Sequence, residues 1–214
     1  MKKEKLIYLD SLRAFAAICV AILHSSLFFN TFFNKNIFIQ NSYLMVEFFF
    51  VLSGFVIAFN YQDKITNSSN LFNFQLKRFL RLYPLHLLTL LLFLGFDSLE
   101  FFKEILLNDI GLSKSFQGRT LDSFIHNLFL THNFFLDYNS WNGPSWSISA
   151  EFYTYLFFAI LLLIAKKMNF SIILFSILII ILSFLYLINH NFLPKYGVIR
   201  CFYGFFLGVL IYNI

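Results

Sequence analysis

The chain has 214 residues, of which 59% are hydrophobic and only 13% are charged. Soluble domains are about half apolar and about a quarter charged, so this composition is typical of a membrane protein. We attribute the net charge of +5 to membrane orientation and expect no nucleic-acid partner. Only two cysteines are present, Cys19 and Cys201, which excludes a disulfide framework and a Cys-based zinc site, and we expect no metal.

The apolar stretches predict the spans. Lys2, Lys3 and Lys5 precede a stretch that is too long for a signal sequence and lacks a small-residue cleavage site, so we expect an uncleaved first span. A span needs about 20 mostly apolar residues, and the spans are expected near residues 12–30, 43–61, 82–98, 143–165, 169–188 and 200–214. The sequence therefore predicts an all-α, polytopic membrane helix bundle with five or six spans.

The region between the third and fourth spans has a different composition. Pro84 is placed in the first turn of the third span, where its missing N–H would be unpaired in any case. Residues 99–122 are rich in charge and predict an amphipathic or loop segment in water. Residues 123–136 are apolar but short, so a re-entrant or interfacial segment is expected there.

The basic residues predict the orientation of the chain. With the N-terminus inside, ten of the 16 basic residues fall on the inner side, namely Lys2, Lys3, Lys5, Arg13, Lys64, Lys77, Arg78, Arg81, Lys166 and Lys167. Loops rich in Lys and Arg stay on the cytoplasmic side, so we expect the N-terminus in the cytoplasm. The last span has about 14 residues after Arg200 and no polar flank, which favours a fragment of a longer chain over a short natural protein.

Two ionisable residues of the first span share a face. Arg13 and His24 are eleven residues apart, which brings them within about 20° of one another and about 16 Å apart along a helix. Ionisable groups inside a span are costly and mark function by default. The alternative is an Arg13 that reaches the headgroups and a His24 that packs against a neighbouring carbonyl.

Two carboxylates enter spans from the outer side. Glu47 lies close to the face of Gly54, and Ser53 and Gly54 are small enough for close helix approach. Glu151 follows Trp146 by about one and a half turns. The alternatives are an interfacial anchor at Glu47 and an aromatic belt with a Glu near water at Glu151.

A basic cluster, Lys77, Arg78 and Arg81, lies at the inner end of the third span. Arg78 and Arg81 are neighbours on a helix, and two guanidinium groups side by side suit a phosphate or pyrophosphate. The alternative is a positive anchor that binds anionic lipid. With His24 and both carboxylates in the outer half, this layout indicates a transmembrane transfer site.

The chain lacks the Walker, dinucleotide-binding and His-Glu-x-x-His motifs, so an ATP-driven pump, a nucleotide-dependent reductase and a zinc protease are disfavoured. No duplicated pattern supports the inverted repeats of transporters.

Five ordered blocks resemble the acyltransferase 3 family of integral membrane O-acyltransferases. The blocks are YLDSLRA at 8–14 with His24, which matches an Arg-or-Lys-x10-His signature; EFFFVLSGF at 47–55, where Glu47 replaces a common Asp; Arg78-x-x-Arg81 with Tyr83-Pro84; WSISAEFY at 146–153; and YGFFLG at 203–208. The family domain has about ten spans of about 20 residues each, so residues 1–214 would be one such domain, incomplete at the C-terminus.

The resemblance implies transfer of an acyl group, most often acetyl, from cytoplasmic acetyl-CoA to a hydroxyl of a surface polysaccharide or a lipid-linked saccharide. It also implies a multi-pass protein among the lipids of a bacterial cytoplasmic membrane. His24 would be the general base, or would carry the acyl group as a nucleophile. Arg78 and Arg81 would hold CoA phosphates, and Arg13 would share that task or align the donor.

In the same hypothesis, Glu151 or Glu47 orients the imidazole of His24 or stabilises its protonated form. Three alternatives stay open. The first is a transporter or flippase in which His24 and the carboxylates relay protons. The second is a non-catalytic scaffold or an inactive truncated membrane protein, and the third is a lipid acyltransferase with a different donor.

Overall fold

The computed structural model describes residues 7–29, 32–107, 116, 118–136, 141–190 and 194–214, and this part of the chain is helical with no strand. Five of its helices are long and apolar enough to cross a membrane, namely α1 (Ile7–Phe28), α3 (Leu44–Tyr61), α4 (Ser68–Leu106), α7 (Trp146–Met168) and α8 (Ile172–Asn189). A sixth apolar helix, α9 (Gly197–Asn213), is shorter. The prediction of an all-α membrane bundle with five or six spans is confirmed.

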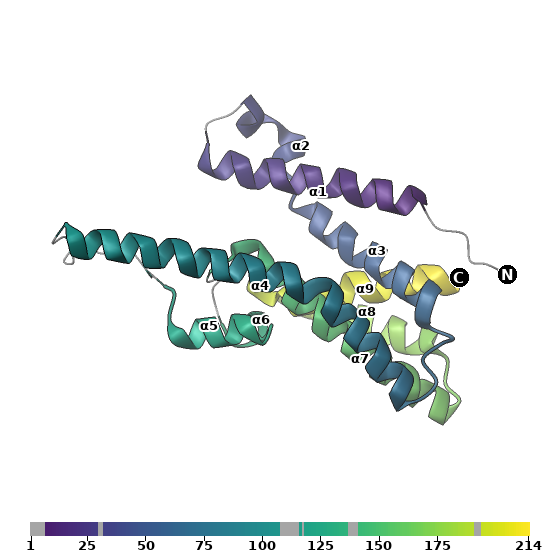
Figure 1. Ribbon diagram of the computed structural model, residues 1–214. Helices are drawn as coiled ribbons and strands as arrows, with labels where there is room; N and C mark the ends of the chain where they lie inside the picture. Colours follow the sequence, from purple (N-terminus) through teal and green to yellow (C-terminus); the bar gives the residue numbers. More distant parts are fainter. Residues whose placement is uncertain (1–6, 30–31, 108–115, 117, 137–140, 191–193) are drawn as a thin grey trace.

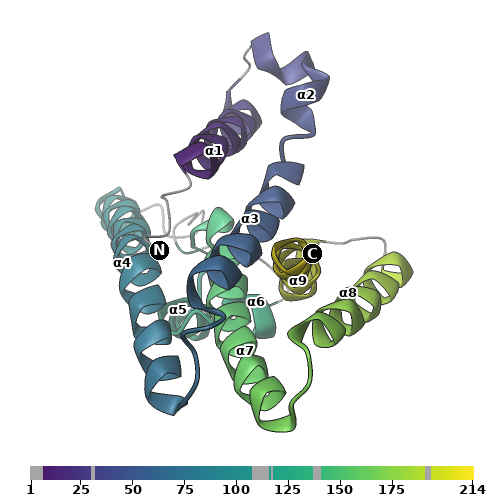
Figure 2. The ribbon, with the colours of Figure 1, turned by 90° about the vertical axis from the view of Figure 1, so that its right-hand side faces the viewer.

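The helices α3 and α9 pack along a seam of glycines. A Cβ atom added at Gly54 would lie 1.9 Å from the carbonyl oxygen of Phe205, and one at Gly208 would lie 2.0 Å from the carbonyl oxygen of Val51. Such distances are too short for any side chain, so only glycine lets the two backbones approach this closely. Figure 2 shows α3 and α9 crossing side by side at the centre of the molecule, and we call this contact the α3–α9 seam.

Polar contacts place the helix ends relative to one another. Lys166, near the end of α7, donates to the carbonyls of Gln62 and Ile65 in the loop between α3 and α4. Gln62 also exchanges hydrogen bonds with Asn213 at the end of α9. We call this end of the bundle the Gln62 end, and the opposite end, where α3, α7 and α9 begin, the Trp146 end.

The helix α4 differs from the prediction. It starts at Ser68, because the side chain of Asn67 accepts the N–H of Asn70 and caps the helix. Pro84 therefore lies in the helix interior and not in its first turn, and the helix continues to Leu106. Figure 1 shows α4 extending well beyond the other long helices. Its charged Glu100 and Lys103 are exposed, which is compatible with a helix that leaves the bundle.

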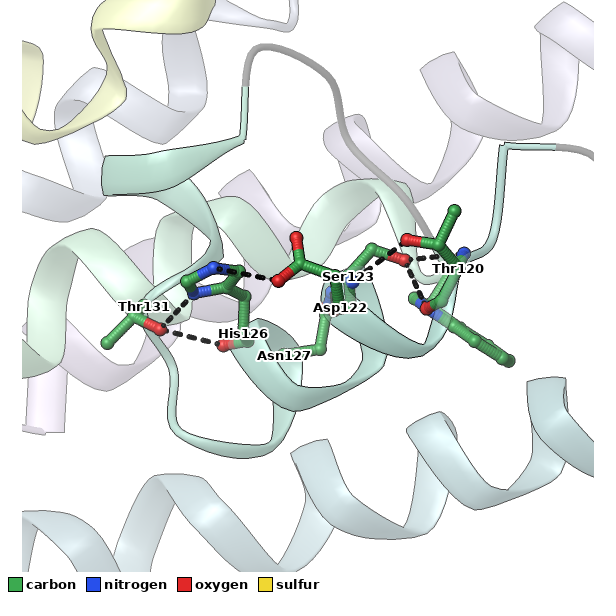
Figure 3. A network of polar contacts seen from close by, with 7 residues as sticks. Thr120, Asp122, Ser123, His126, Asn127 and Thr131 are labelled. Atoms are coloured by element: carbon green, nitrogen blue, oxygen red, sulfur yellow. Dashed lines mark hydrogen bonds and ion pairs between the residues drawn. The ribbon is translucent and has the colours of Figure 1, made fainter.

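The segment expected to be re-entrant or interfacial forms two short helices, α5 (Leu121–Leu128) and α6 (His132–Phe135), which lie alongside the far half of α4 in Figure 1. Thr120 and Ser123 form a capping box at the start of α5, and Figure 3 shows His126 between Asp122 and Thr131. Buried Asp97 of α4 pairs with Arg119, which ties this segment to α4. The remaining short helices are α2 (Ile37–Gln40), η1 (Phe32–Lys35), η3 (Gly143–Ser145) and η4 (Pro194–Tyr196).

Candidate active site

A cavity of about 340 Å³ lies between α1, α3, α4 and α7. It is lined by five of the six residues that the sequence singled out, namely Arg13, His24, Arg78, Arg81 and Glu151. Arg13 and His24 come from α1, the other two arginines from α4 and the carboxylate from α7. Groups from three helices and up to about 140 residues apart in the chain therefore share one space.

His24 is held in one tautomer by its own helix. Its Nδ1 lies 2.8 Å from the carbonyl oxygen of Val20, and both residues line the cavity. A carbonyl oxygen can only accept a hydrogen bond, so Nδ1 carries the proton when the ring is neutral. The lone pair is then on Nε2, which is the nitrogen that can take a proton from a bound group.

Among the described residues, the three arginines use few of their donors. Arg13 donates to the carbonyl of Leu52 at 3.4 Å and lies 3.9 Å from Asp10. Arg78 donates to the hydroxyl of Tyr61 at 3.1 Å, and its guanidinium lies over the Tyr61 ring. Arg81 is exposed and has no ion pair within the described residues. These guanidinium groups therefore give the cavity a strongly positive wall toward the Gln62 end.

Glu151 is held by two hydroxyl groups. Ser53 of α3 and Tyr155 of α7 both donate to its Oε1 through short hydrogen bonds, and all three residues line the cavity. The two hydroxyls therefore hold the carboxylate in one position at the cavity wall. In the structure His24 bonds to the carbonyl of Val20 and Glu151 to the two hydroxyls, so the described contacts include no hydrogen bond between Glu151 and His24.

Glu47 does not line the cavity. It forms an ion pair with Arg200 of α9, whose Nε donates to its Oε1 at 2.7 Å. In the sequence, Arg200 marks only the start of the last span. The available signal was its position one turn inside an apolar helix, where a charge needs a partner. Only the tertiary structure identifies that partner.

Two further histidines lie outside the cavity. The rings of His86 and His132 stack with centroids 5.8 Å apart, and both side chains are buried. His86 donates to the carbonyl of Asn127, and His132 lies 3.3 Å from the hydroxyl of Ser145. Burial lowers the pKa of His132, in the short helix α6, to about 4, so this side chain is neutral at physiological pH. The part of the chain that the structure describes contains no group of three or more His, Cys, Asp or Glu that could hold a metal ion.

Comparison with known proteins bears on the activity. A family model described as an acyltransferase domain (Acyl_transf_3) matches residues 6–214. Protein 2 in the picA locus of Rhizobium radiobacter is 41% identical over 90 residues, which cover 42% of this chain and 44% of that protein. Acyltransferase MdmB of Streptomyces mycarofaciens is 29% identical over 127 residues, which cover 58% of this chain and 29% of that protein. The matched parts span less than half the length of these curated relatives, and no solved structure matches the chain.

Proposed function

The chain belongs to the acyltransferase 3 family of membrane acyltransferases, and from this premise we propose that it moves an acetyl group from acetyl-CoA to a hydroxyl of a glycan. The observation that carries the proposal is the cavity, in which three guanidinium groups line one space with a histidine whose Nε2 has no partner among the described residues. CoA carries phosphate groups, for which paired arginines are the preferred ligands. The acceptor would be a surface polysaccharide or a lipid-linked saccharide.

In the proposed reaction, acetyl-CoA binds from the Gln62 end of the cavity. Arg78 and Arg81 bind the CoA phosphates there, and Arg13 of α1 aligns the thioester arm toward His24. Arg13 and His24 are eleven positions apart, which corresponds to about 16 Å of helix that the flexible arm of CoA must cross. The basic residues near the Gln62 end favour a cytoplasmic position for that end in a bacterial cytoplasmic membrane.

The chemical step needs one base. The acceptor oxygen attacks the thioester carbonyl carbon and forms the new C–O bond while its proton moves to Nε2 of His24. The C–S bond then breaks and CoA leaves. The proton on Nε2 passes to the departing CoA sulfur, which returns His24 to its neutral form. The carboxylate of Glu151 faces the same cavity and lowers the electrostatic cost of the transient imidazolium. A positioned base of this kind contributes about 10²- to 10⁴-fold to the rate.

The test compares two histidines with the same local geometry. His190 also places Nδ1 2.8 Å from the carbonyl four residues earlier, that of Tyr186, but it does not line the cavity. We expect His24→Ala to lower transfer of labelled acetyl groups from acetyl-CoA to saccharide by at least about 10²-fold, and His190→Ala to leave it unchanged. The assay uses inverted membrane vesicles with labelled acetyl-CoA outside.

Three results would contradict the proposal. Transfer by His24→Ala at the wild-type rate would exclude His24 as the base. Equal losses in both variants would indicate a general effect of removing a histidine. Movement of saccharide across the membrane without incorporation of label, and independent of acetyl-CoA, would favour a flippase that uses His24 as a proton relay.

A further inference from the structure

The indole of Trp146 is held at the Trp146 end of the cavity by groups from two other helices. The guanidinium carbon of Arg200 lies 5.0 Å from the Trp146 ring centroid, and Phe50 meets the indole edge to face with centroids 5.9 Å apart. A Cβ atom added at Gly197 would lie 2.5 Å from Cε3 of Trp146, so the indole rests directly on the backbone of α9. These contacts fix the orientation of the ring.

Arg200 is in turn held by Glu47. Both Nε and Nη2 of Arg200 donate to the same oxygen, Oε1, and the Arg200 side chain is only 10% exposed. The two residues belong to α9 and α3 and lie beside Gly204, where an added Cβ would be 3.3 Å from the carbonyl oxygen of Glu47. The ion pair therefore fixes Arg200 on the rigid α3–α9 seam, and Arg200 transmits that position to Trp146.

The cavity wall around Trp146 differs from the wall around the arginines. The lining residues that contact Trp146 or neighbour it along the chain are Phe50, Pro144 and Ser147, none of which is charged, and Arg200 does not itself line the cavity, whereas His24 does. A phosphate group would find its partners at the arginines and not here. A neutral, hydroxylated ring with an apolar C–H face, such as a pyranose, would pack that face on the indole and present a hydroxyl to His24.

We propose that Trp146 is the platform for a pyranose acceptor and that Arg200 and Glu47 are positioning residues that hold it. The proposal rests on the proposed acetyl transfer. It gives Glu47 a role different from the catalytic one considered from the sequence, because its carboxylate acts through Arg200 and touches neither His24 nor the cavity. Trp146 then contributes to acceptor binding, whereas Arg78 and Arg81 contribute to donor binding.

The first experiment measures the KM values for donor and acceptor separately. The full chain in lipid nanodiscs transfers label from acetyl-CoA to methyl glucopyranoside, with glycerol as an acceptor that has hydroxyls but no ring face. We expect Arg200→Gln and Glu47→Gln to raise the KM for methyl glucopyranoside about five- to tenfold, because the platform loses its orientation. The KM values for acetyl-CoA and for glycerol should stay within about twofold of wild type.

A charge swap separates positioning from simple stabilisation. The double variant Glu47→Arg with Arg200→Glu keeps an ion pair across the seam but removes the guanidinium from the Trp146 ring. We expect it to regain most of the melting temperature lost by the single variants and to keep the raised KM for methyl glucopyranoside. Lys195→Gln is the matched control, since Lys195 lies over the ring of Tyr196 at 5.2 Å and does not line the cavity with Trp146. This control should behave as wild type.

Three outcomes would overturn the proposal. The KM values for donor and acceptor could rise together, the charge swap could restore both the melting temperature and the acceptor KM, or Arg200→Gln could leave the acceptor KM unchanged.

If the wild type transfers no label to either acceptor, the proposed acetyl transfer fails, and a fluorescence measurement then tests separately whether the pyranose binds on Trp146. Trp141 and Trp146 are the two tryptophans of the chain, so Trp141→Phe leaves only Trp146 emission. Methyl glucopyranoside should shift that emission, and less so with Arg200→Gln; no shift would exclude the platform.

Discussion

The α3–α9 seam and the helix α1 differ in how tightly they pack against the rest of the molecule. Along the seam, glycines bring two backbones into direct contact, and Gly54 and Gly208 admit no side chain. On α1, by contrast, Ala16 and Cys19 are the buried side chains among those described, and the helix packs mainly on α3. Figure 2 shows α1 at the edge of the bundle, beyond α3. Yet α1 carries His24, the proposed base, whereas the described residues of the seam contribute no base to the cavity.

The comparison indicates a division of tasks. The seam, with Glu47 and Arg200 bridging it, fixes the walls of the cavity, and most of its residues act through packing. The helix α1 contributes Arg13 and His24, whose positions depend on few tertiary contacts and on a hydrogen bond within the helix itself. We therefore expect substitutions in the seam to change stability first, and substitutions that face the cavity to change kinetics first.

The largest effect is expected where the seam is tightest. Gly54→Ala places a Cβ 1.9 Å from a backbone oxygen, so we expect the free energy of unfolding to fall by about 3 kcal/mol. Gly95→Ala is the matched control in α4, because nothing lies within 4 Å of its added Cβ, and it should gain about 0.5–1 kcal/mol from a better helix former. Denaturant titration in mixed micelles measures both. Equal responses at the two glycines would remove the distinction between the seam and the rest of the bundle.

The next effect concerns the positive wall of the cavity. Arg81→Gln should raise the KM for acetyl-CoA about tenfold, because one charge-assisted contact to a phosphate is lost, and should leave the melting temperature unchanged. Lys77→Gln removes a neighbouring positive charge that does not line the cavity, and its KM should stay near that of wild type. Steady-state kinetics with varied acetyl-CoA distinguish the two. A similar rise for Lys77→Gln would assign the effect to overall surface charge.

A smaller effect, on kcat, is expected at Glu151, where hydroxyls from α3 and α7 hold the carboxylate. Tyr155→Phe removes one of the two hydroxyls that donate to Glu151, and we expect kcat to fall roughly fivefold as the carboxylate loses its fixed position. Tyr153→Phe is the control, since the Tyr153 hydroxyl donates to the carbonyl of Phe129 away from the cavity. If both variants keep the wild-type kcat, Glu151 does not depend on this network.

The smallest effect is a pH dependence outside the cavity. Burial lowers the pKa of His132 to about 4, so the unfolded chain binds a proton at a higher pH than the folded chain does. The stability from the neutral side chain is complete well above pH 6.5 and is lost as the pH falls from there toward 4, which amounts to about 1 kcal/mol between pH 8 and pH 6. Melting curves at the two pH values should show this loss, and His132→Phe should reduce it. An unchanged pH dependence in that variant would place the titrating group elsewhere.

The parts of the fold that follow from local composition were predictable. Apolar runs gave the spans, since burying a helix in lipid requires about 20 apolar residues in sequence. The errors occur where capping decides a boundary: Asn67 starts α4 well before Pro84, and Pro84 is tolerated in its interior. The shared face of Arg13 and His24 followed from helical geometry alone, and the two residues do line one cavity.

The sequence by itself determined that this is a helical membrane protein of the acyltransferase 3 family and named five of the residues that line the cavity. Only the tertiary structure decided the partners. Glu47 meets Arg200 across 153 positions, and Glu151 meets Ser53 across 98, instead of either carboxylate meeting His24. Helical periodicity fixes the face on which a residue lies, but its partner depends on which faces come together, and here the glycines of α3 and α9 decide that.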